Sequence, residues 1–147
     1  LLVNSCSKSK KKLYGVKAIE LYDGPAFKII RKYIPTNVDL WILSAKYGLI
    51  SGNDIIDYYD EKMTIYKAKN MAISIVNKIE NLIKNRTYQE ILLNLGKNYM
   101  IAFDKSLSIL RKNNPQMKIT ILEGSIGIRL KGLKEWLILR GYSDEIR

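Results

Sequence analysis

Two hydrophobic patterns alternate along this chain: short apolar runs, and longer segments in which apolar residues recur every three or four positions. The short runs are Leu1–Asn4, Val38–Leu43, Glu90–Leu95 and Lys118–Leu122. Because each run is short, mostly aliphatic and bounded by polar residues, each predicts a buried strand. The segments between them predict helices.

The first predicted helix follows Tyr22-Asp23-Gly24-Pro25, in which we expect Asp23 to cap and Pro25 to occupy the first turn. The longest helix is expected from about Glu61 to Asn85, and a third from about Asn98 to Lys112. The last contains Ile126, Leu130, Leu133 and Leu137, and we expect it to end at Gly141. Trp136 and Leu137 are assigned to the core or to a dimer seam.

The order β-α-β-α-β-α-β-α predicts one α/β domain over residues 1–147. We expect a three-layer sandwich with a mainly parallel, four-stranded sheet and right-handed crossovers. The loops after parallel strands meet at one edge of a sheet, which is where ligands bind in this architecture. Those loops are Cys6–Lys12, Ser44–Tyr47, Gly96–Tyr99 and Glu123–Gly127.

The net charge of the chain narrows the class of molecule that we expect it to bind. Lys and Arg number 25 against 14 Asp and Glu, a net charge of +11. This excess is typical of proteins that bind nucleic acid or another anionic surface. A lysine-rich, solvated surface explains the charge outside the first loop equally well.

The absence of histidine and the single cysteine exclude several kinds of site. A Ser-His-Asp or Cys-His relay, a histidine-rich zinc site and an all-thiolate zinc site within one chain are excluded. We expect no metal and no cofactor, and acid–base chemistry is left to Lys, Tyr, Asp, Glu or Cys. One cysteine suits a reducing compartment and no apolar run reaches ~20 residues, so we expect a cytoplasmic protein without membrane contact. The oligomeric state stays open.

The candidate catalytic residues are a thiol, two amines, a hydroxyl and a carboxylate at the predicted strand ends. Amines beside Cys6 favour its thiolate and raise its nucleophilicity, although a lone cysteine is also a common packing residue. In the second loop, Lys46 is placed to hold a phosphate or polarise a leaving group, and the alternative is an ordinary strand-to-loop transition with Gly48 at positive φ. The carboxylate of Asp57 is placed to orient water, and the alternative is a solvated acidic loop. The set is Cys6, Lys10, Ser44, Lys46 and Asp57.

The candidate nucleic-acid contacts are cations and two tyrosines. The lysine run after Cys6 suits phosphate binding, with a solvated loop as the alternative, and tyrosine rings suit stacking on bases. Gly124-Ser125-Ile126-Gly127 begins a helix and is a weak anion-binding signal that nearby cations extend. The set is Lys8, Lys11, Lys12, Tyr22, Tyr47, Lys97 and Arg129.

Three segments resemble the YaaA-type proteins, the peroxide-stress group. Leu21-Tyr22-Asp23-Gly24-Pro25-Ala26-Phe27 is similar to their LYxGxxF segment. Leu43–Ile50 followed by Asp54–Tyr58 is similar to LSxxYGxLxPxDxIxPY, and Leu93–Tyr99 to INLAsxEY. The opening Cys6-Ser7-Lys8-Ser9-Lys10 also resembles the PCxxxKPY segment of archaeosine synthase, although Ser5, Lys11 and Lys12 depart from it and its later histidine has no counterpart.

Both resemblances imply an α/β fold related to that of uracil-DNA glycosylases, and they imply nucleic acid, DNA or RNA, as the partner. They support a role for Cys6, Lys10, Ser44, Lys46 and Tyr47. The first hypothesis is therefore a nucleic-acid-associated protein that acts on a base or modified nucleoside, as a transferase or with glycosidase-type activity. A non-catalytic DNA- or RNA-binding module is the second, and an enzyme for a nucleotide or small anion is the third.

Overall fold

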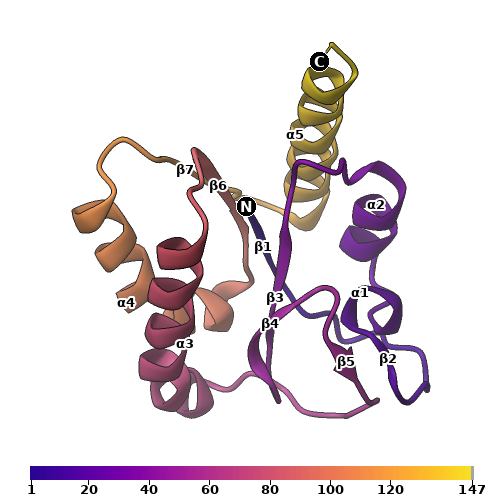
Figure 1. Ribbon diagram of the computed structural model, residues 1–147. Helices are drawn as coiled ribbons and strands as arrows, with labels where there is room; N and C mark the ends of the chain where they lie inside the picture. The colour runs from indigo at the N-terminus through magenta and orange to yellow at the C-terminus, as the bar shows by residue number, and fades with distance from the viewer. Residues whose placement is uncertain (147) are drawn as a thin grey trace.

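The computed structural model describes the backbone of residues 1–146 and the side chains of residues 1–142. Its centre is a five-stranded sheet in the order β4-β3-β1-β6-β7. Strands β1 (Leu2–Ser5), β3 (Leu40–Ser44), β6 (Glu90–Asn94) and β7 (Lys118–Ile121) run parallel, and β4 (Gly48–Ser51) pairs antiparallel with β3 (Figure 1). The mixed α/β class and the mainly parallel sheet are as expected.

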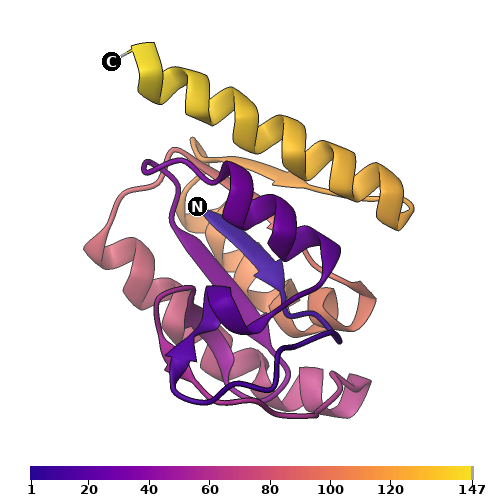
Figure 2. The ribbon, with the colours of Figure 1, turned by 90° about the vertical axis from the view of Figure 1, so that its right-hand side faces the viewer.

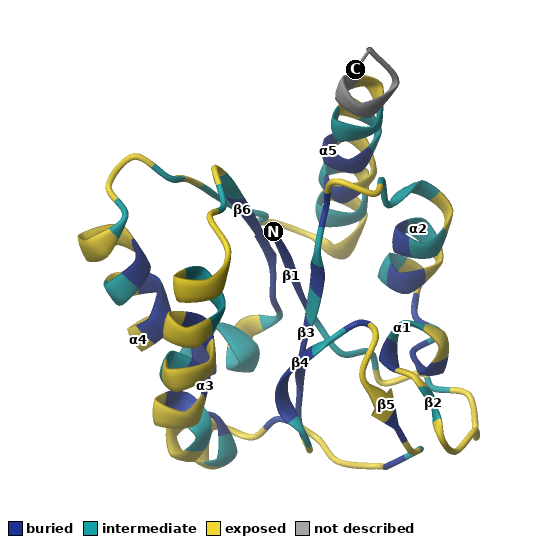
Figure 3. Cartoon of the chain, in the orientation of Figure 1, coloured by how far each residue is buried: buried dark blue, intermediate teal, exposed yellow. Residues whose placement is uncertain are grey.

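Helices lie on both faces of this sheet (Figures 1 and 2). Helices α3 (Ile65–Asn85) and α4 (Lys97–Asn113) pack on one face, and α1 (Ala18–Leu21), α2 (Pro25–Tyr33) and α5 (Ile126–Ile146) on the other. Neighbouring residues of β1 face opposite sides, so Val3 joins the core beneath α3 and α4 while Leu2 joins the core beneath α2 and α5. Figure 3 shows the central strands β1 and β3 largely buried and the outer faces of α3 and α4 exposed.

The sheet has five strands where the sequence predicts four, because residues 48–51 fold back on β3. Gly48 has the expected positive φ, +73°, the left-handed conformation that glycine adopts readily, but it leads into strand β4 and not into a loop. Ser44 Oγ accepts the N–H groups of Lys46 (3.1 Å) and Tyr47 (3.0 Å), which closes the turn. A second, two-stranded sheet pairs β2 (Val16–Lys17) with β5 (Ile55–Ile56).

The predicted end of one helix and the predicted cap of another are wrong, although Pro25 lies in the first turn of α2 as expected. Helix α5 continues through Gly141 to Ile146. Gly141 does not adopt the positive φ that is typical of a glycine at the end of a helix. Helix α2 is capped by Gly24 without a side-chain hydrogen bond, because the Asp23 carboxylate pairs with Arg31 instead (3.4 Å). Trp136 and Leu137 lie in the core beneath α2 and α5, which excludes the dimer seam for these two side chains.

Candidate functional site

The carboxyl ends of β1, β3 and β6 bring sequence-distant side chains together. Cys6 follows β1, Ser44 ends β3, and Tyr99 lies in the first turn of α4 after β6. The Cys6 Sγ atom lies 2.9 Å from the Tyr99 hydroxyl. Cys6 is half-buried and contacts both halves of the core. The single thiol therefore sits at the junction of the three strands.

Tyr59 connects this junction to the turn after β3. Its hydroxyl lies 2.7 Å from both the Tyr22 hydroxyl and Ser44 Oγ. Ser44 Oγ already accepts two backbone N–H groups, which occupy both of its lone pairs. Its own hydrogen is then left for donation to Tyr59. The three hydroxyl groups thus form a continuous chain from the turn after β3 to Tyr22, which follows α1.

Burial keeps the phenols of this cluster protonated. It raises the pKa of Tyr22 to about 12. The pKa of Tyr59 is also raised, first by burial and then by Cys6 and Tyr22, and the pKa of Tyr99 is raised by burial and by the neighbouring Cys6. These phenols therefore stay protonated and do not act as bases, and Tyr99 is the one that contacts the Cys6 thiol.

Lys10, Lys46 and Tyr47 surround the same tyrosine. The Lys10 Nζ atom lies 4.6 Å from the centre of the Tyr59 ring, a cation–π distance. The Tyr47 ring meets the Tyr59 ring edge-on at 5.5 Å, and Lys46 Nζ lies 5.2 Å from the Tyr47 ring. Four predicted side chains, Lys10, Ser44, Lys46 and Tyr47, are thus brought into one cluster.

A cavity of about 210 Å³ opens on the other side of Cys6. It lies between the end of β1 and the first turns of α2 and α5, and Phe27 lines it. Asn4 and Asn94 contribute two almost fully buried amides, joined by a hydrogen bond of 2.7 Å from Asn94 Nδ2 to Asn4 Oδ1. Arg129 donates from Nε to Asn94 Oδ1 (3.1 Å), so a buried amide orients its guanidinium beside the cavity.

The lysine-rich loop follows Ser7, which lines this cavity, and hydrogen bonds hold its backbone in place. The N–H of Lys11 donates to the Leu21 carbonyl, and that of Asp23 to the Ser9 carbonyl (both 2.9 Å). Gly24 is required here, because a Cβ at this position would lie 2.7 Å from the Cβ of Ser7. The exposed side chains of Lys8, Lys11 and Lys12 project from a braced backbone.

The remaining predicted residues lie in different surroundings. Tyr22 is fully buried, and because its ring has no free face, the expected stacking on a base does not fit this position. The Asp57 carboxylate accepts the N–H of Gly15 (2.7 Å), which gives it a role in loop structure. Lys97 is exposed at the start of α4, and Arg129 lines the cavity.

Four residues of this region escaped the sequence prediction: Tyr59, Tyr99, Asn4 and Asn94. A usable signal existed for the two asparagines, since each is a polar residue at the end of an apolar strand, and they are paired in the register of β1 and β6. Within the part of the chain described, the structure holds no cluster of three or more Asp, Glu, Cys or His side chains suited to a metal ion. The described helices include none long and apolar enough to span a membrane.

Comparison with solved structures shows a shared fold. The crystal structure of AF0587, described as a protein of unknown function, superimposes with a TM-score of 0.54 at 10% sequence identity. The match covers 92% of this chain and 43% of the other, so the chain spans less than half the length of that protein. No curated protein matches the sequence. Residues 1–135 match the family of unknown function DUF6884, and the chain belongs to that family.

Proposed function

We propose that this chain is a YaaA-like, nucleic-acid-associated protein that receives a single base or modified nucleoside at the carboxyl ends of its parallel strands. The observation that carries the proposal is the cavity beside Cys6, lined by Arg129 and two buried amides, with the lysine-rich loop following directly after its lining residue Ser7. The cavity suits one part of a polymer, and the loop suits the adjoining phosphates.

Size and chemistry support a single ring as the occupant. At about 210 Å³ the cavity is smaller than the roughly 300–1,000 Å³ of pockets for drug-sized ligands. Phe27 offers an apolar wall, while Arg129 and the asparagine amides offer groups that pair with the polar edge of a base. A base reaches such a cavity only when it is unstacked, as in single strands or a flipped nucleotide.

The arrangement also supports chemistry at the thiol. The Tyr99 phenol stays protonated and can donate to a Cys6 thiolate, and Lys10 adds positive charge to the same cluster. In this version Cys6 or Lys10 is the nucleophile or polar anchor, and Lys46 holds a phosphate. The reaction class is a nucleobase- or nucleoside-modifying transferase or a glycosidase. The parallel order β3-β1-β6-β7, with helices on both faces, supports the expected three-layer fold related to uracil-DNA glycosylases.

The test of binding is the salt dependence of affinity for a labelled single-stranded oligonucleotide, measured by fluorescence polarisation. A variant with Lys8, Lys11 and Lys12 replaced by Gln should bind more weakly, with a log–log slope shallower by about 0.7 for each phosphate that the loop no longer neutralises. The control replaces Lys105, Arg111 and Lys112 of α4 by Gln, which removes the same charge on the α4 face. Equal weakening in both variants, or no binding by the wild type at low salt, would contradict the proposal.

A non-catalytic binding module is the second candidate. The hydrogen bond between the Asp57 carboxylate and Gly15 N–H favours it, because this carboxylate then has a structural use and is less suited to activate water. Mass spectrometry of nucleosides from RNA and DNA incubated with the protein separates the two candidates. A mass change that Cys6→Ala abolishes supports the enzyme, whereas unchanged nucleosides with unaltered binding by Cys6→Ala support the module.

A further inference from the structure

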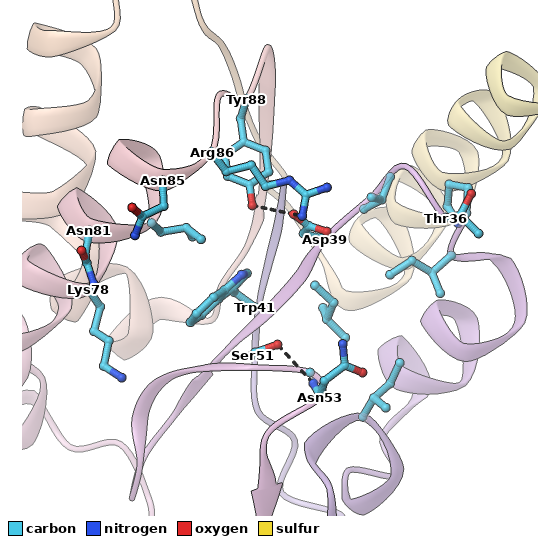
Figure 4. Close-up of a pocket in the computed structure, with 17 residues that line it drawn as sticks. Thr36, Asp39, Trp41, Ser51, Asn53, Lys78, Asn81, Asn85, Arg86 and Tyr88 are labelled. Atoms are coloured by element: carbon cyan, nitrogen blue, oxygen red, sulfur yellow. Dashed lines mark hydrogen bonds and ion pairs between the residues drawn. The ribbon is translucent and has the colours of Figure 1, made fainter. Parts of the chain in front are cut away.

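A second, larger hollow lies at the opposite end of the sheet from Cys6. It is a groove of about 790 Å³ at the amino end of β3, bordered by α3 and by the turn after β4. The half-buried indole of Trp41 lies at its centre, between α3 and Asn53 (Figure 4). None of the residues predicted as catalytic or as nucleic-acid contacts lines this groove.

Polar side chains border the indole on two sides. Lys78, Asn81 and Asn85 step by three and four along α3 and so share one face of the helix. All three are exposed, and Figure 4 shows the two amides on the α3 side of the indole. Each asparagine amide offers both donors and an acceptor. The groove therefore combines an aromatic platform with neutral hydrogen-bonding groups.

The charge of the groove is positive. Its one carboxylate, on Asp39, lies 3.0 Å from the Arg86 guanidinium and accepts a hydrogen bond from the Tyr88 hydroxyl (2.6 Å). Lys78 has no ion-pair partner among the residues whose side chains are described. Arg86 thus neutralises the Asp39 carboxylate within the groove, while the Lys78 amine stays available to bind an anion.

We propose that this groove binds single-stranded nucleic acid, with one base stacked on Trp41 and a neighbouring phosphate on Lys78. The inference rests on the proposed function and adds a second contact region remote from the Cys6 cavity. Sites for single strands combine aromatic platforms with cations that follow the backbone. The net charge of +11 favours a polyanion over a neutral ring-shaped ligand such as a sugar.

Tryptophan fluorescence tests the stacking directly, because the chain has only two tryptophans. The second, Trp136, is buried in the core beneath α2 and α5. Titration with a single-stranded oligonucleotide of about 12 nucleotides, within the range that single-strand sites cover, should quench the emission. Quenching should persist in Trp136→Phe and disappear in Trp41→Phe, which keeps a flat ring in the groove.

Affinity supplies the second measurement. Trp41→Ala should weaken binding of the labelled oligonucleotide about 5- to 150-fold, the effect expected when one stacked base is removed. Asn85→Ala, an exposed substitution that leaves the core intact, should weaken binding by a smaller factor. Lys78→Gln should make the salt slope shallower by about 0.7. Lys105→Gln, on α4, is the matched control and should leave the slope unchanged.

The outcomes separate this inference from the proposed function. If the labelled oligonucleotide binds and responds to the substitutions in the Lys8–Lys12 loop, but Trp41 is not quenched and Trp41→Ala binds normally, the groove proposal is overturned while the proposed function stands. Quenching of Trp41 by a neutral oligosaccharide, and not by the oligonucleotide, overturns it too. Absence of oligonucleotide binding at low salt overturns both.

Discussion

The Tyr59 hydroxyl links two other buried hydroxyl groups of the candidate site. It joins Ser44, at the end of β3, to Tyr22, which follows α1. Both partners are fully buried, so neither has water as a substitute when Tyr59 is changed. Unsatisfied buried hydroxyls are costly, which makes this side chain a test of whether the cluster is built as described.

Tyr59→Phe should lower the free energy of unfolding by about 1–3 kcal/mol, because it removes the hydroxyl that bonds to the buried hydroxyls of both Ser44 and Tyr22. Urea unfolding followed by circular dichroism measures the change. Tyr66→Phe is the control, since Tyr66 is 78% exposed on α3 and should shift stability by less than about 0.5 kcal/mol. Equal midpoints for the two variants would show that the hydroxyl chain contributes nothing.

At the level of single residues, the sequence predicted which loops form the candidate site better than which side chains contact one another there. Cys6, Lys10, Ser44 and Tyr47 were predictable because each follows or ends a strand whose apolar pattern is clear. Tyr59 was not, because it lies in an irregular segment beyond β5, where no periodicity indicates which side chain turns inward. The burial of Tyr22 was hidden for a similar reason, since the short helix α1 before it carries too few residues to show a pattern.

At the scale of elements, two glycines have opposite roles. Gly48 makes the tight turn from β3 to β4 with a φ of +73°, whereas Gly141 lies inside α5 without positive φ. A Cβ at either position would meet no atom within 4 Å, so backbone conformation alone separates them. The pair therefore isolates the conformational preference of glycine from packing.

Gly48→Ala should destabilise the protein by about 1–2 kcal/mol, the cost of a left-handed residue with a side chain. Gly141→Ala should be neutral or stabilising, by up to about 1 kcal/mol, because alanine is the better helix former. Both are measured as urea unfolding midpoints. A decrease in stability in Gly141→Ala would restore the sequence-based expectation that Gly141 terminates the helix.

Elements with a strong period were predictable and those without one were not. The end of α3 and the bounds of β6 fall close to expectation because a long apolar stripe and a compact aliphatic run define them, whereas α3 begins at Ile65, four residues later than expected. Strand β4 was missed because its residues, Gly48–Ser51, follow a tight turn and look like a loop when its partner β3 is unknown. The two-residue strands β2 and β5 carry no periodic signal at all.

On the scale of the whole molecule, buried phenols link folding to alkaline pH. The pKa of Tyr22 is raised to about 12 from an ordinary value of 10, and those of Tyr59 and Tyr99 are raised as well. The unfolded chain then loses these protons at a lower pH than the folded one. The stability that these phenols contribute to the folded state is fully present below pH 10 and is lost as the pH rises from there toward and beyond 12.

Unfolding by alkali should therefore release tyrosinate absorbance from these three phenols together with the loss of circular dichroism. The two signals are followed on one sample as the pH is raised. In Tyr59→Phe the cooperative step should occur at lower pH, since the hydroxyl chain is already broken. Complete ionisation of all tyrosines before any loss of secondary structure would mean that the cluster is open to solvent.

The order of strands has a consequence for synthesis of the chain. Residues 2–5 lie in the middle of the sheet, and both of their neighbours come later, at residues 40–44 and 90–94. On a ribosome this apolar segment waits for its second partner for about 5–20 seconds at ordinary translation rates. During that interval it is exposed to chaperones and to other nascent chains, so expression yield should depend on how well the cell shields residues 2–5.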